Sequence, residues 1–298
     1  DGESVVMRLL DQSAGLLTLT ATGMPDHILS KVRKLVKSPN GMFLVTGPTG
    51  SGKTTTLYGC LSELNSAESK IITVEDPVEY RLPRINQVQI NNKINLSFSS
   101  VLRTALRQDP DIIMVGEIRD QETAEIGLRA ALTGHMVLST LHTNDAVSTA
   151  LRLIDMGAAP YLVASSLRAV LAQRLVRRIC SSCKVTYKAT HQEITWVSNI
   201  AGEDKSGVEF AKGGGCQSCN NTGYKGRIGV YELLEMSNEA LISALRNGDT
   251  DGFAHAAKSV PGYKTLGQTA LELAESGVTT IAEVLRISEI VSDTATYN

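Results

Sequence analysis

The stretch "GPTGSGKTTT", Gly47 to Thr56, decides the fold of this chain. It holds the pattern G-x-x-x-x-G-K-[ST] in Gly47, Gly52, Lys53 and Thr54. An apolar run, "GMFLVT", precedes it, and a helical pattern follows it. Strand, glycine-rich loop and helix are the context that a P-loop needs. The sequence therefore predicts a nucleoside triphosphate site, and a glycine-rich turn that binds nothing is the less favoured interpretation.

Each part of this loop has a physical role in holding phosphate. Backbone N–H groups turn toward phosphate oxygens, and the N-terminus of the following helix adds partial positive charge. Lys53 is expected to reach the β- and γ-phosphates, and Thr54 is expected to offer its hydroxyl to Mg²⁺. The predicted nucleotide-binding residues are Gly47, Pro48, Thr49, Gly50, Ser51, Gly52, Lys53, Thr54 and Thr55.

The composition is aliphatic and nearly neutral. The 298 residues include 29 basic and 31 acidic side chains, which give a net charge of −2, and only 4% are aromatic. With no long run of one charge sign, the sequence predicts no nucleic-acid partner. The sequence also lacks a signal peptide and an apolar run of the roughly 18 residues that span a bilayer. We therefore expect a cytoplasmic protein that is not inserted into a membrane and reaches one only through partners.

Strand-like and helix-like patterns alternate between about residues 41 and 174. The predicted strands are near-continuous apolar runs, typical of parallel strands that are covered on both faces, and they span 43–46, 71–75, 112–116 and 136–141. Helices are predicted in 26–37, 97–110, 120–134 and 160–178. This alternation predicts an α/β fold with a RecA-like or other P-loop core.

Acidic residues follow two of the predicted strands. In "DPDIIMVGEIRD", Glu117 comes after four apolar residues and a glycine, so we expect it on the magnesium side of the nucleotide. In "IITVEDPVEYRLPR", Glu75 and Asp76 end a strand and Glu79 follows. We expect Glu75 to activate water and include Glu79 among the catalytic residues. For Asp76, a solvated acidic loop is an equal alternative.

Two histidines flank the strand in "TGHMVLSTLHTNDA". His142 follows the strand, where a hydrogen bond to the γ-phosphate would change on hydrolysis. His135 precedes the strand, and its interpretation stays open between a structural and a functional role. His142 is therefore the predicted catalytic histidine.

Four of the five cysteines form two C-x₂-C pairs, Cys180 with Cys183 and Cys216 with Cys219, and Cys60 stands alone. In a reducing compartment such pairs favour tetrahedral Zn²⁺ over disulfides. Because four thiolates leave no open coordination position, we predict a structural zinc rather than a catalytic one.

We divide the chain into four parts on these patterns. Residues 1–23 are expected to be the end of a truncated N-terminal domain plus a linker, partly because "SVVMRLL" at 4–10 predicts a strand without a partner. A RecA-like ATPase core in 24–178 follows, then an inserted tetracysteine metal-binding lobe in 179–232. A C-terminal helical subdomain in 233–298 contains two amphipathic patterns and a polar tail, "SDTATYN", that we expect to be disordered.

The four boxes "GPTGSGKTTT", "VEDPVEY", "RQDPDIIMVGEIRD" and "TGHMVLSTLHTNDA", in this order, resemble the secretion ATPase superfamily of type II secretion and type IV pili. The resemblance covers essentially the whole chain, and the boxes correspond to the family's Walker A, Asp box, Walker B and His box. It implies a homo-hexameric ring that binds ATP·Mg²⁺ between subunits and drives an inner-membrane platform protein. The tetracysteine lobe is similar to the assembly motors, the GspE/PilB/MshE group, rather than the retraction motors.

Arginines are consistent with a site shared between subunits. Arg103 and Arg107 are four residues apart on one predicted helix, and Arg119 closely follows Glu117. Surface arginines are ordinarily solvated, but a guanidinium from a subunit edge can stabilise charge on a neighbour's γ-phosphate. The resemblance favours this role for all three and for Arg227. It also implies further arginines on the preceding domain, so we expect this chain alone to hydrolyse ATP poorly.

Three other functions stay open at this point. A RecA-like nucleic-acid motor would need a basic groove with stacking aromatic residues, against which one Trp and four Phe argue. A small-molecule kinase with a zinc-stapled lid would transfer phosphate to an acceptor. A nucleotide-gated assembly module would bind ATP and barely hydrolyse it, which the intact Lys53, Glu75 and Glu117 disfavour.

Overall fold

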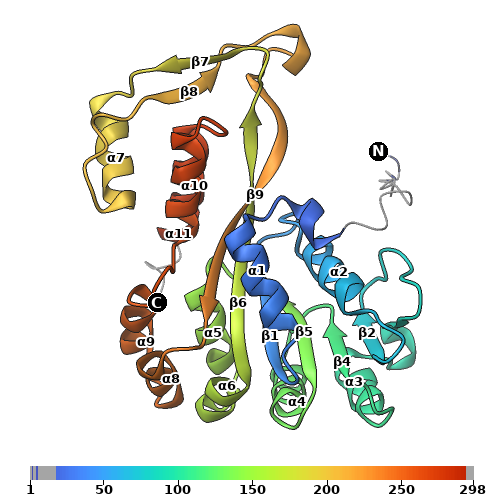
Figure 1. The fold of residues 1–298 in the computed structure, drawn as a ribbon. Coiled ribbons are helices and arrows are strands. Elements are labelled where there is room, and N and C mark those ends of the chain that lie inside the picture. Colours follow the sequence, from blue (N-terminus) through green and yellow to red (C-terminus); the bar gives the residue numbers. More distant parts are fainter. Residues whose placement is uncertain (1, 3–4, 6–17, 293–298) are drawn as a thin grey trace.

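The computed structural model describes residues 2, 5 and 18–292. Figure 1 shows a sheet flanked by helices, with a long two-stranded ribbon rising from it toward a small lobe. The strand expected in 4–10 and the polar tail expected in 292–298 fall almost entirely outside the described residues. No helix in the described part of the chain is long and apolar enough to cross a membrane.

A seven-stranded sheet forms the core, in the order β3-β2-β4-β5-β1-β6-β9. All neighbours in it are parallel except β9, which runs antiparallel to β6. The four predicted strands are present. The strand bounds are β1 Gly41–Thr46, β2 Ile71–Glu75, β3 Asn86–Gln89, β4 Ile112–Val115, β5 Met136–Leu141, β6 Leu167–Ile179 and β9 Tyr224–Glu235.

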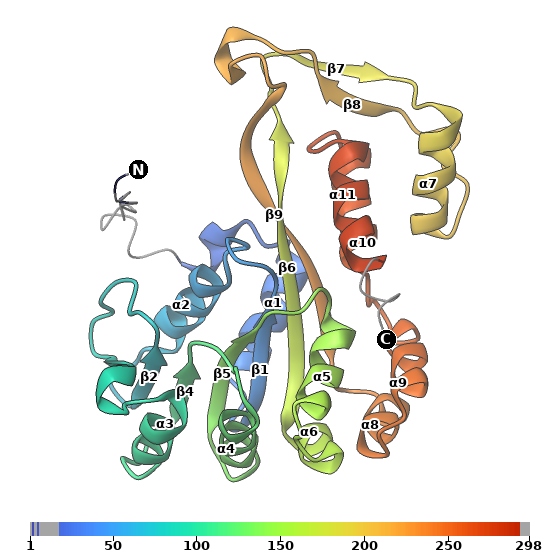
Figure 2. The ribbon, with the colours of Figure 1, turned by 180° about the vertical axis from the view of Figure 1, so that it is seen from behind.

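Helices cover both faces of this sheet, which is why β1, β2, β4 and β5 are buried at every residue. On one face lie α1 Asp26–Val36 and α2 Lys53–Leu64, preceded by the 3₁₀ turn η2 Leu19–Thr22. On the other lie α3 Phe98–Leu106, α4 Gln121–Leu132, α5 Ala146–Asp155 and α6 Pro160–Ser166 (Figures 1 and 2). A short turn, η3 Asn92–Ile94, precedes α3. The arrangement confirms the predicted α/β class.

The prediction of one helix over 160–178 is wrong beyond its first two turns. The helix α6 ends at Ser166, and the chain continues as β6. The segment from Leu167 to Val176 is rich in Ala, Leu, Gln and Arg, which suit a helix in isolation. Here it lies between β1 and β9 in the sheet, so tertiary pairing and burial override local propensity.

The strands β6 and β9 continue past the sheet edge as a ribbon that carries the lobe. The lobe contains β7 Lys184–Tyr187, α7 His191–Ala201, β8 Phe210–Gly213 and the turn η4 Gln217–Cys219. The C-terminal helices α8 Glu239–Arg246, α9 Thr250–Lys258, α10 Leu266–Glu275 and α11 Ile281–Ser292 follow. Because β9 belongs to the core sheet, it crosses the boundary that the sequence placed between 232 and 233.

Candidate functional site

The P-loop connects the end of β1 to α2, where backbone geometry requires glycine. Gly52 is the N-cap of α2 and has φ of 90°, in the left-handed region. Gly47 has φ of 147°, and a Cβ there would lie 2.4 Å from the carbonyl oxygen of Gln173. Lys53 Nζ donates to the carbonyl oxygens of Gly47 at 2.8 Å and Pro48 at 3.0 Å. The lysine therefore lies along the inside of the loop, as a phosphate-binding lysine must.

The loop rests on β6 through Gln173, whose side chain is buried. Its Nε2 donates to the carbonyl oxygen of Ser51 at 2.7 Å, and its Oε1 accepts from Thr56 Oγ1 at 2.8 Å. Gln173 thus links the loop to the first turn of α2. Sequence reasoning missed this residue because it placed the segment in a helix.

A cavity of about 410 Å³ opens between the loop and the carboxyl ends of β2, β4 and β5. Parallel strands end at the same edge, so residues that lie far apart in the sequence meet there. Eleven of the residues singled out above line the cavity, namely Thr49, Gly50, Gly52, Lys53, Thr54, Thr55, Glu75, Asp76, Glu79, Glu117 and His142.

Glu117 lies at the centre of an ionic network. Its Oε1 accepts from Arg119 Nη2 at 2.6 Å, and its Oε2 lies 3.6 Å from His142 Nε2. Arg119 also approaches Asp76, at 3.3 Å. The hydrogen bond from Arg119 lowers the pKa of Glu117, against the opposing effect of burial. The carboxylate is thus ionised at neutral pH, as a magnesium ligand must be.

Burial and nearby charge also shift the pKa values of two nitrogen bases in the cavity, Lys53 and His142. Burial lowers the pKa of Lys53 to about 8, although Glu117 opposes that shift. Burial and the charge of Lys53 likewise lower the pKa of His142, which favours the neutral imidazole at pH 7. A neutral His142 can both donate and accept a hydrogen bond.

Glu75 is held by three donors at the end of β2. Tyr58 donates to its Oε1, and its Oε2 accepts from Thr73 Oγ1 at 2.5 Å and Gln87 Nε2 at 3.1 Å. Burial and this carboxylate raise the pKa of Tyr58, so the phenol remains a donor. A carboxylate has about four lone-pair positions, so the three donors leave one for a water molecule. None of the three donors carries a motif that sequence reasoning could have used.

The remaining predicted residues lie elsewhere. His135 lies before β5, at the opposite end of the strand, where its Nδ1 is 3.1 Å from the carbonyl oxygen of Ala130. Arg103 pairs with Glu122 on the outer surface, and Arg107 is exposed at the C-terminus of α3. Arg227 lines a different cavity. Of the four predicted arginines, the structure brings only Arg119 to the carboxylates of the nucleotide cavity.

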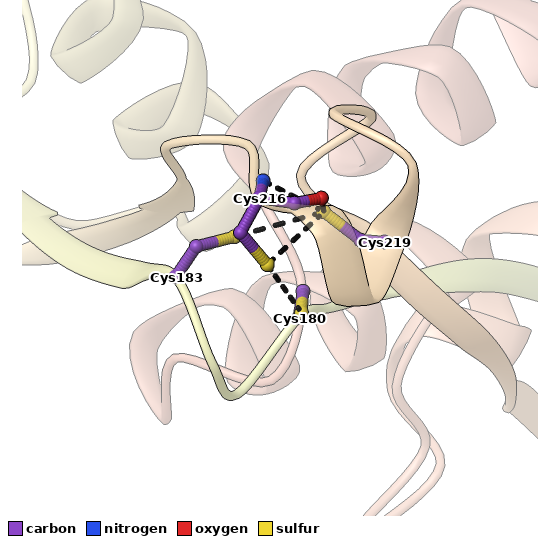
Figure 3. A group of neighbouring side chains, drawn as sticks. All are labelled: Cys180, Cys183, Cys216 and Cys219. Atoms are coloured by element: carbon purple, nitrogen blue, oxygen red, sulfur yellow. Dashed lines mark hydrogen bonds between the residues drawn. The ribbon is translucent and has the colours of Figure 1, made fainter.

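The four paired cysteines meet at the base of the lobe (Figure 3). Their ligand atoms lie within 4.8 Å of one another, and three Sγ to Sγ distances are 3.7, 3.8 and 3.9 Å. These distances are far longer than the ~2.05 Å of a disulfide. Four thiolates at a Zn–S distance of ~2.3 Å in a tetrahedron would lie about 3.8 Å apart, so the geometry fits zinc.

Backbone donors favour the thiolate form of Cys219. The N–H groups of Cys216 and Gly223 each donate to the Sγ of Cys219 at 3.3 Å. Burial opposes ionisation, but these bonds lower the pKa of Cys219 to about 6. The remaining cysteine, Cys60, is buried in the core, where burial raises its pKa to about 12. It is therefore an inert core residue.

Comparisons with known proteins identify relatives over most of the chain. A family model described as "Type II/IV secretion system protein" matches residues 1–286. The type II secretion system protein HxcR of Pseudomonas aeruginosa is 48% identical over 287 residues, which cover 96% of this chain and 57% of that protein. The type IV pilus assembly ATPase PilB of Myxococcus xanthus is 46% identical over 284 residues, which cover 95% of this chain and 50% of that protein.

The fold matches solved structures as well. A crystal structure of the pilus retraction motor PilT with bound ADP has a TM-score of 0.67 and 31% identity, covering 91% of this chain and 66% of that one. The Legionella pneumophila ATPase DotB, with a TM-score of 0.66 and 24% identity, shares the fold. These matches confirm the RecA-like architecture. The chain spans 50–57% of the length of these two curated relatives.

Proposed function

We propose, because this chain belongs to the type II/IV secretion system protein family, that it hydrolyses ATP to ADP and phosphate as the motor of an assembly machine. The machine would be a type IV pilus or a type II secretion pseudopilus, as in the relatives named above. One observation carries the proposal. A single cavity is lined by the P-loop lysine and by carboxylates from two neighbouring strand ends.

Different residues of the nucleotide cavity would have different roles in hydrolysis. The P-loop amides and Lys53 would hold the phosphates, while Thr54 and Glu117 would hold Mg²⁺, which neutralises charge on the β- and γ-oxygens. Glu75 has a lone pair left for the attacking water, and Glu79 lines the same cavity. His142, 3.6 Å from Glu117, would report on the γ-phosphate.

A homo-hexameric ring would complete the site from a neighbouring subunit. Arg103 and Arg107 are exposed and do not line the nucleotide cavity of their own chain. This placement supports a role on a neighbour's γ-phosphate. The ring would act in the cytoplasm and reach the inner membrane through a platform protein and associated assembly proteins, without inserting into the bilayer or binding nucleic acid.

The cysteine cluster would hold a structural zinc through Cys180, Cys183, Cys216 and Cys219. The sulfur separations fit a tetrahedral ion, and the second cysteine pair lies on the turn that leads into β9. The metal would fix the two ends of the inserted segment at the tip of the ribbon. Residues 179–232 would then behave as a lobe closed at its base, between the core and the C-terminal helices.

ATP hydrolysis per subunit, measured against protein concentration with Mg²⁺, tests this function. The specific activity should rise with concentration, since the site is completed between subunits. Lys53→Ala should lower turnover at least ~100-fold, and Glu117→Gln should bind ATP but fail to hydrolyse it. Glu209→Gln, which removes an exposed carboxylate from the lobe, is the matched control and should retain full activity.

Three outcomes would contradict the proposal. Substantial activity that does not vary with concentration would mean that each subunit is self-sufficient. Turnover retained in Glu117→Gln would remove that carboxylate from the mechanism. Stimulation by DNA or RNA, or transfer of phosphate to an added small-molecule acceptor, would favour the nucleic-acid motor or the kinase instead.

A further inference from the structure

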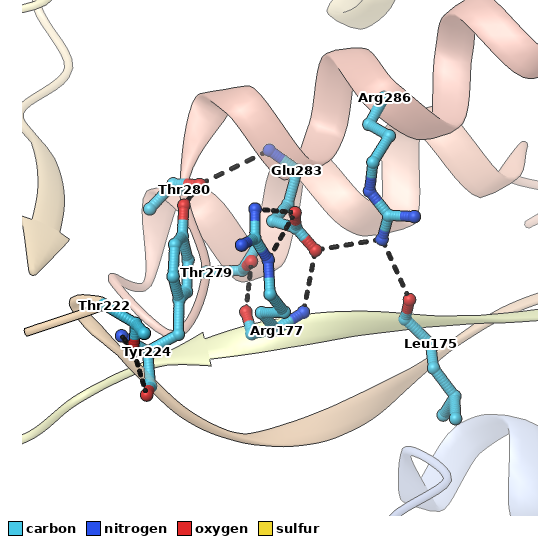
Figure 4. Close-up of polar contacts among 8 residues, drawn as sticks. All are labelled: Leu175, Arg177, Thr222, Tyr224, Thr279, Thr280, Glu283 and Arg286. Atoms are coloured by element: carbon cyan, nitrogen blue, oxygen red, sulfur yellow. Dashed lines mark hydrogen bonds and ion pairs between the residues drawn. The ribbon is translucent and has the colours of Figure 1, made fainter. Parts of the chain in front are cut away.

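Three glutamate side chains among the described residues are almost fully buried, Glu75, Glu232 and Glu283. Glu75 lines the nucleotide cavity. Glu283 accepts hydrogen bonds from the guanidinium groups of Arg177 and Arg286, so its charge is paired (Figure 4). Glu232 does not line the nucleotide cavity, and within the described ranges it forms no ion pair with a basic side chain. Its role is therefore not explained by the site described above.

The carboxylate of Glu232, on β9, accepts hydrogen bonds from three donors. Its Oε1 accepts from the backbone N–H of Ala146 at 2.8 Å and from the hydroxyl of Tyr263 at 2.7 Å. Its Oε2 accepts from the backbone N–H of Leu266 at 2.9 Å. Ala146 and Leu266 are the first residues of α5 and α10, and a helix N-terminus has unpaired N–H groups and partial positive charge. One carboxylate thus joins the N-termini of two helices.

Neither helix depends on Glu232 alone for its N-terminal cap. Asp145 caps α5 by accepting from the N–H of Ser148 at 2.7 Å, and Thr265 caps α10 by accepting from that of Gln268 at 3.3 Å. Burial and the charge of Asp145 raise the pKa of Glu232 to about 7, although the three donors oppose that shift. What this buried carboxylate adds is a shared acceptor, because α5 and α10 cannot separate without losing a hydrogen bond to it.

The α5 end of this link leads back to the nucleotide cavity. Residues 142–146, here called the His142 loop, connect His142 in the cavity lining to the first residue of α5. Within the loop, the N–H of Thr143 donates to Thr46 Oγ1 at 3.0 Å, and the two hydroxyl oxygens are 2.6 Å apart. Thr46 is the last residue before the P-loop. The His142 loop therefore contacts both the nucleotide cavity and Glu232.

The α10 end of the link leads to the lobe and the ribbon. Figures 1 and 2 show α10 and α11 between the ribbon and α7 of the lobe. Glu275, at the end of α10, forms an ion pair with Lys205 of the lobe at 2.7 Å. On α11, Glu283 accepts from the backbone and the guanidinium of Arg177 in the ribbon. A change at the N-terminus of α10 is thus one helix away from both.

We propose that Glu232 is a positioning residue that couples the His142 loop to α10, so that a nucleotide on the P-loop stabilises the C-terminal helices. A nucleotide that fixes His142 would hold the N–H of Ala146 against Glu232, and Glu232 would hold the N–H of Leu266. The inference rests on the proposed function only in that a nucleotide occupies the cavity. Because coupling between two sites is reciprocal, a partner that displaces α10 would weaken nucleotide binding by the same factor.

Hydrogen exchange followed by mass spectrometry, with and without the ATP analogue AMP-PNP and Mg²⁺, tests this coupling. In the wild type the analogue should slow exchange of the α10 amides about fivefold or more. Glu232→Gln should abolish this slowing, because the amide has one acceptor oxygen and its NH₂ group would face the N–H of Ala146 or Leu266. Glu272→Gln, the same change at an exposed position of α10 whose partner is the exposed Lys264, should retain it.

A second variant keeps the test decisive if Glu232→Gln, checked by circular dichroism, does not fold. Tyr263→Phe removes the hydroxyl that donates to Glu232 and leaves both backbone bonds in place. It should reduce the slowing in α10 about twofold or more without abolishing it. The analogue is not hydrolysed, so the measurement does not depend on turnover. Slowed exchange in the P-loop reports nucleotide binding itself, which separates a failure of the proposed function from a failure of the coupling.

Two results would overturn the proposal. The first is a wild type in which the analogue protects the P-loop and leaves exchange in α10 unchanged. The second is a Glu232→Gln or Tyr263→Phe variant in which α10 exchanges faster but the analogue still slows it by the wild-type factor, because Glu232 would then only stabilise the fold.

Discussion

In the sheet at the centre of the molecule, β1 and β5 bury all their residues, whereas in the lobe β7 leaves three of its four residues exposed. The helix of the lobe, α7, has one fully buried side chain, Val197, while α2 in the core has six buried residues. The core is stabilised by apolar burial from two covered faces. The lobe has fewer buried apolar side chains, among them Val197 and Phe210, and four cysteines meet at its base.

The difference suggests that one chain uses two independent sources of stability. A structural zinc contributes about 10–16 kcal/mol in small zinc-binding domains, comparable with the whole stability of an ordinary domain. Loss of the metal should therefore affect the lobe and spare the core, and damage to the core should do the opposite. Four changes test this comparison, from the largest expected effect to the smallest.

Metal removal should have the largest effect. Cys183→Ser, or treatment of the wild type with a strong chelator, should unfold residues 180–223 because the lobe would lose the zinc that we propose closes its base. Hydrogen exchange should show fast exchange in β7 and β8 while β1 and β5 stay protected. Cys60→Ser, a cysteine change within the core, should leave the metal content at one zinc per chain. Full protection of the lobe without metal would show that its packing suffices.

Leu138→Ala should destabilise the core by about 2–5 kcal/mol, since it leaves a cavity at a fully buried position of β5. Denaturant unfolding followed by circular dichroism would measure this. Val185→Ala removes two methyl groups from a residue of β7 that is 46% exposed, so it should change stability by less than ~0.5 kcal/mol. Equal losses in both variants would mean that the lobe is packed as tightly as the core.

Glu283→Gln should weaken the junction between the ribbon and α11 by about 1–3 kcal/mol at pH 7, because the guanidinium groups of Arg177 and Arg286 lose their charged acceptor. Burial opposes ionisation of Glu283, but the backbone N–H of Arg177 and both guanidinium groups lower its pKa. A carboxylate whose pKa is lower in the folded state than in the unfolded state stabilises the fold at pH values above its unfolded pKa. This stabilisation is lost as the pH falls through the folded-state pKa.

The difference in unfolding free energy between wild type and Glu283→Gln should therefore have its full size at pH 7. It should shrink toward zero as the pH falls below about 4.5. Urea unfolding at several pH values would measure it. A gap that persists unchanged at low pH would show that the amide disturbs packing rather than charge.

Glu122→Gln should have the smallest effect. It removes the partner of Arg103 at a site where both side chains are more than half exposed. Such pairs contribute about 0–1 kcal/mol, so the melting temperature should hardly change. A loss above 2 kcal/mol would mean that surface charge, and not only apolar burial, stabilises the core.

Much of this architecture could be read from local pattern. The P-loop, the acidic strand ends and the cysteine pairs each depend on short spacing within one segment, and the strands of the core appear as apolar runs. Parallel strands end at one edge, so the meeting of Lys53, Glu75 and Glu117 follows from that pattern once the fold class is known. The sequence by itself determined these features because their physical cause is local.

Only the tertiary structure decided the rest. Residues 167–179 became β6 because the flanking strands paired with them, and that strand brought Gln173 beneath the P-loop and Arg174 beside it. Tyr58 of α2 and Gln87 of β3 reach Glu75 for the same reason, since those elements converge on the end of β2. The cavity lined by Arg174, Arg177, Arg227 and Arg286 joins two strands and a helix whose residues lie up to 112 positions apart in sequence. No local sequence pattern predicts that these distant residues come together, because their contacts depend on long-range strand pairing and burial.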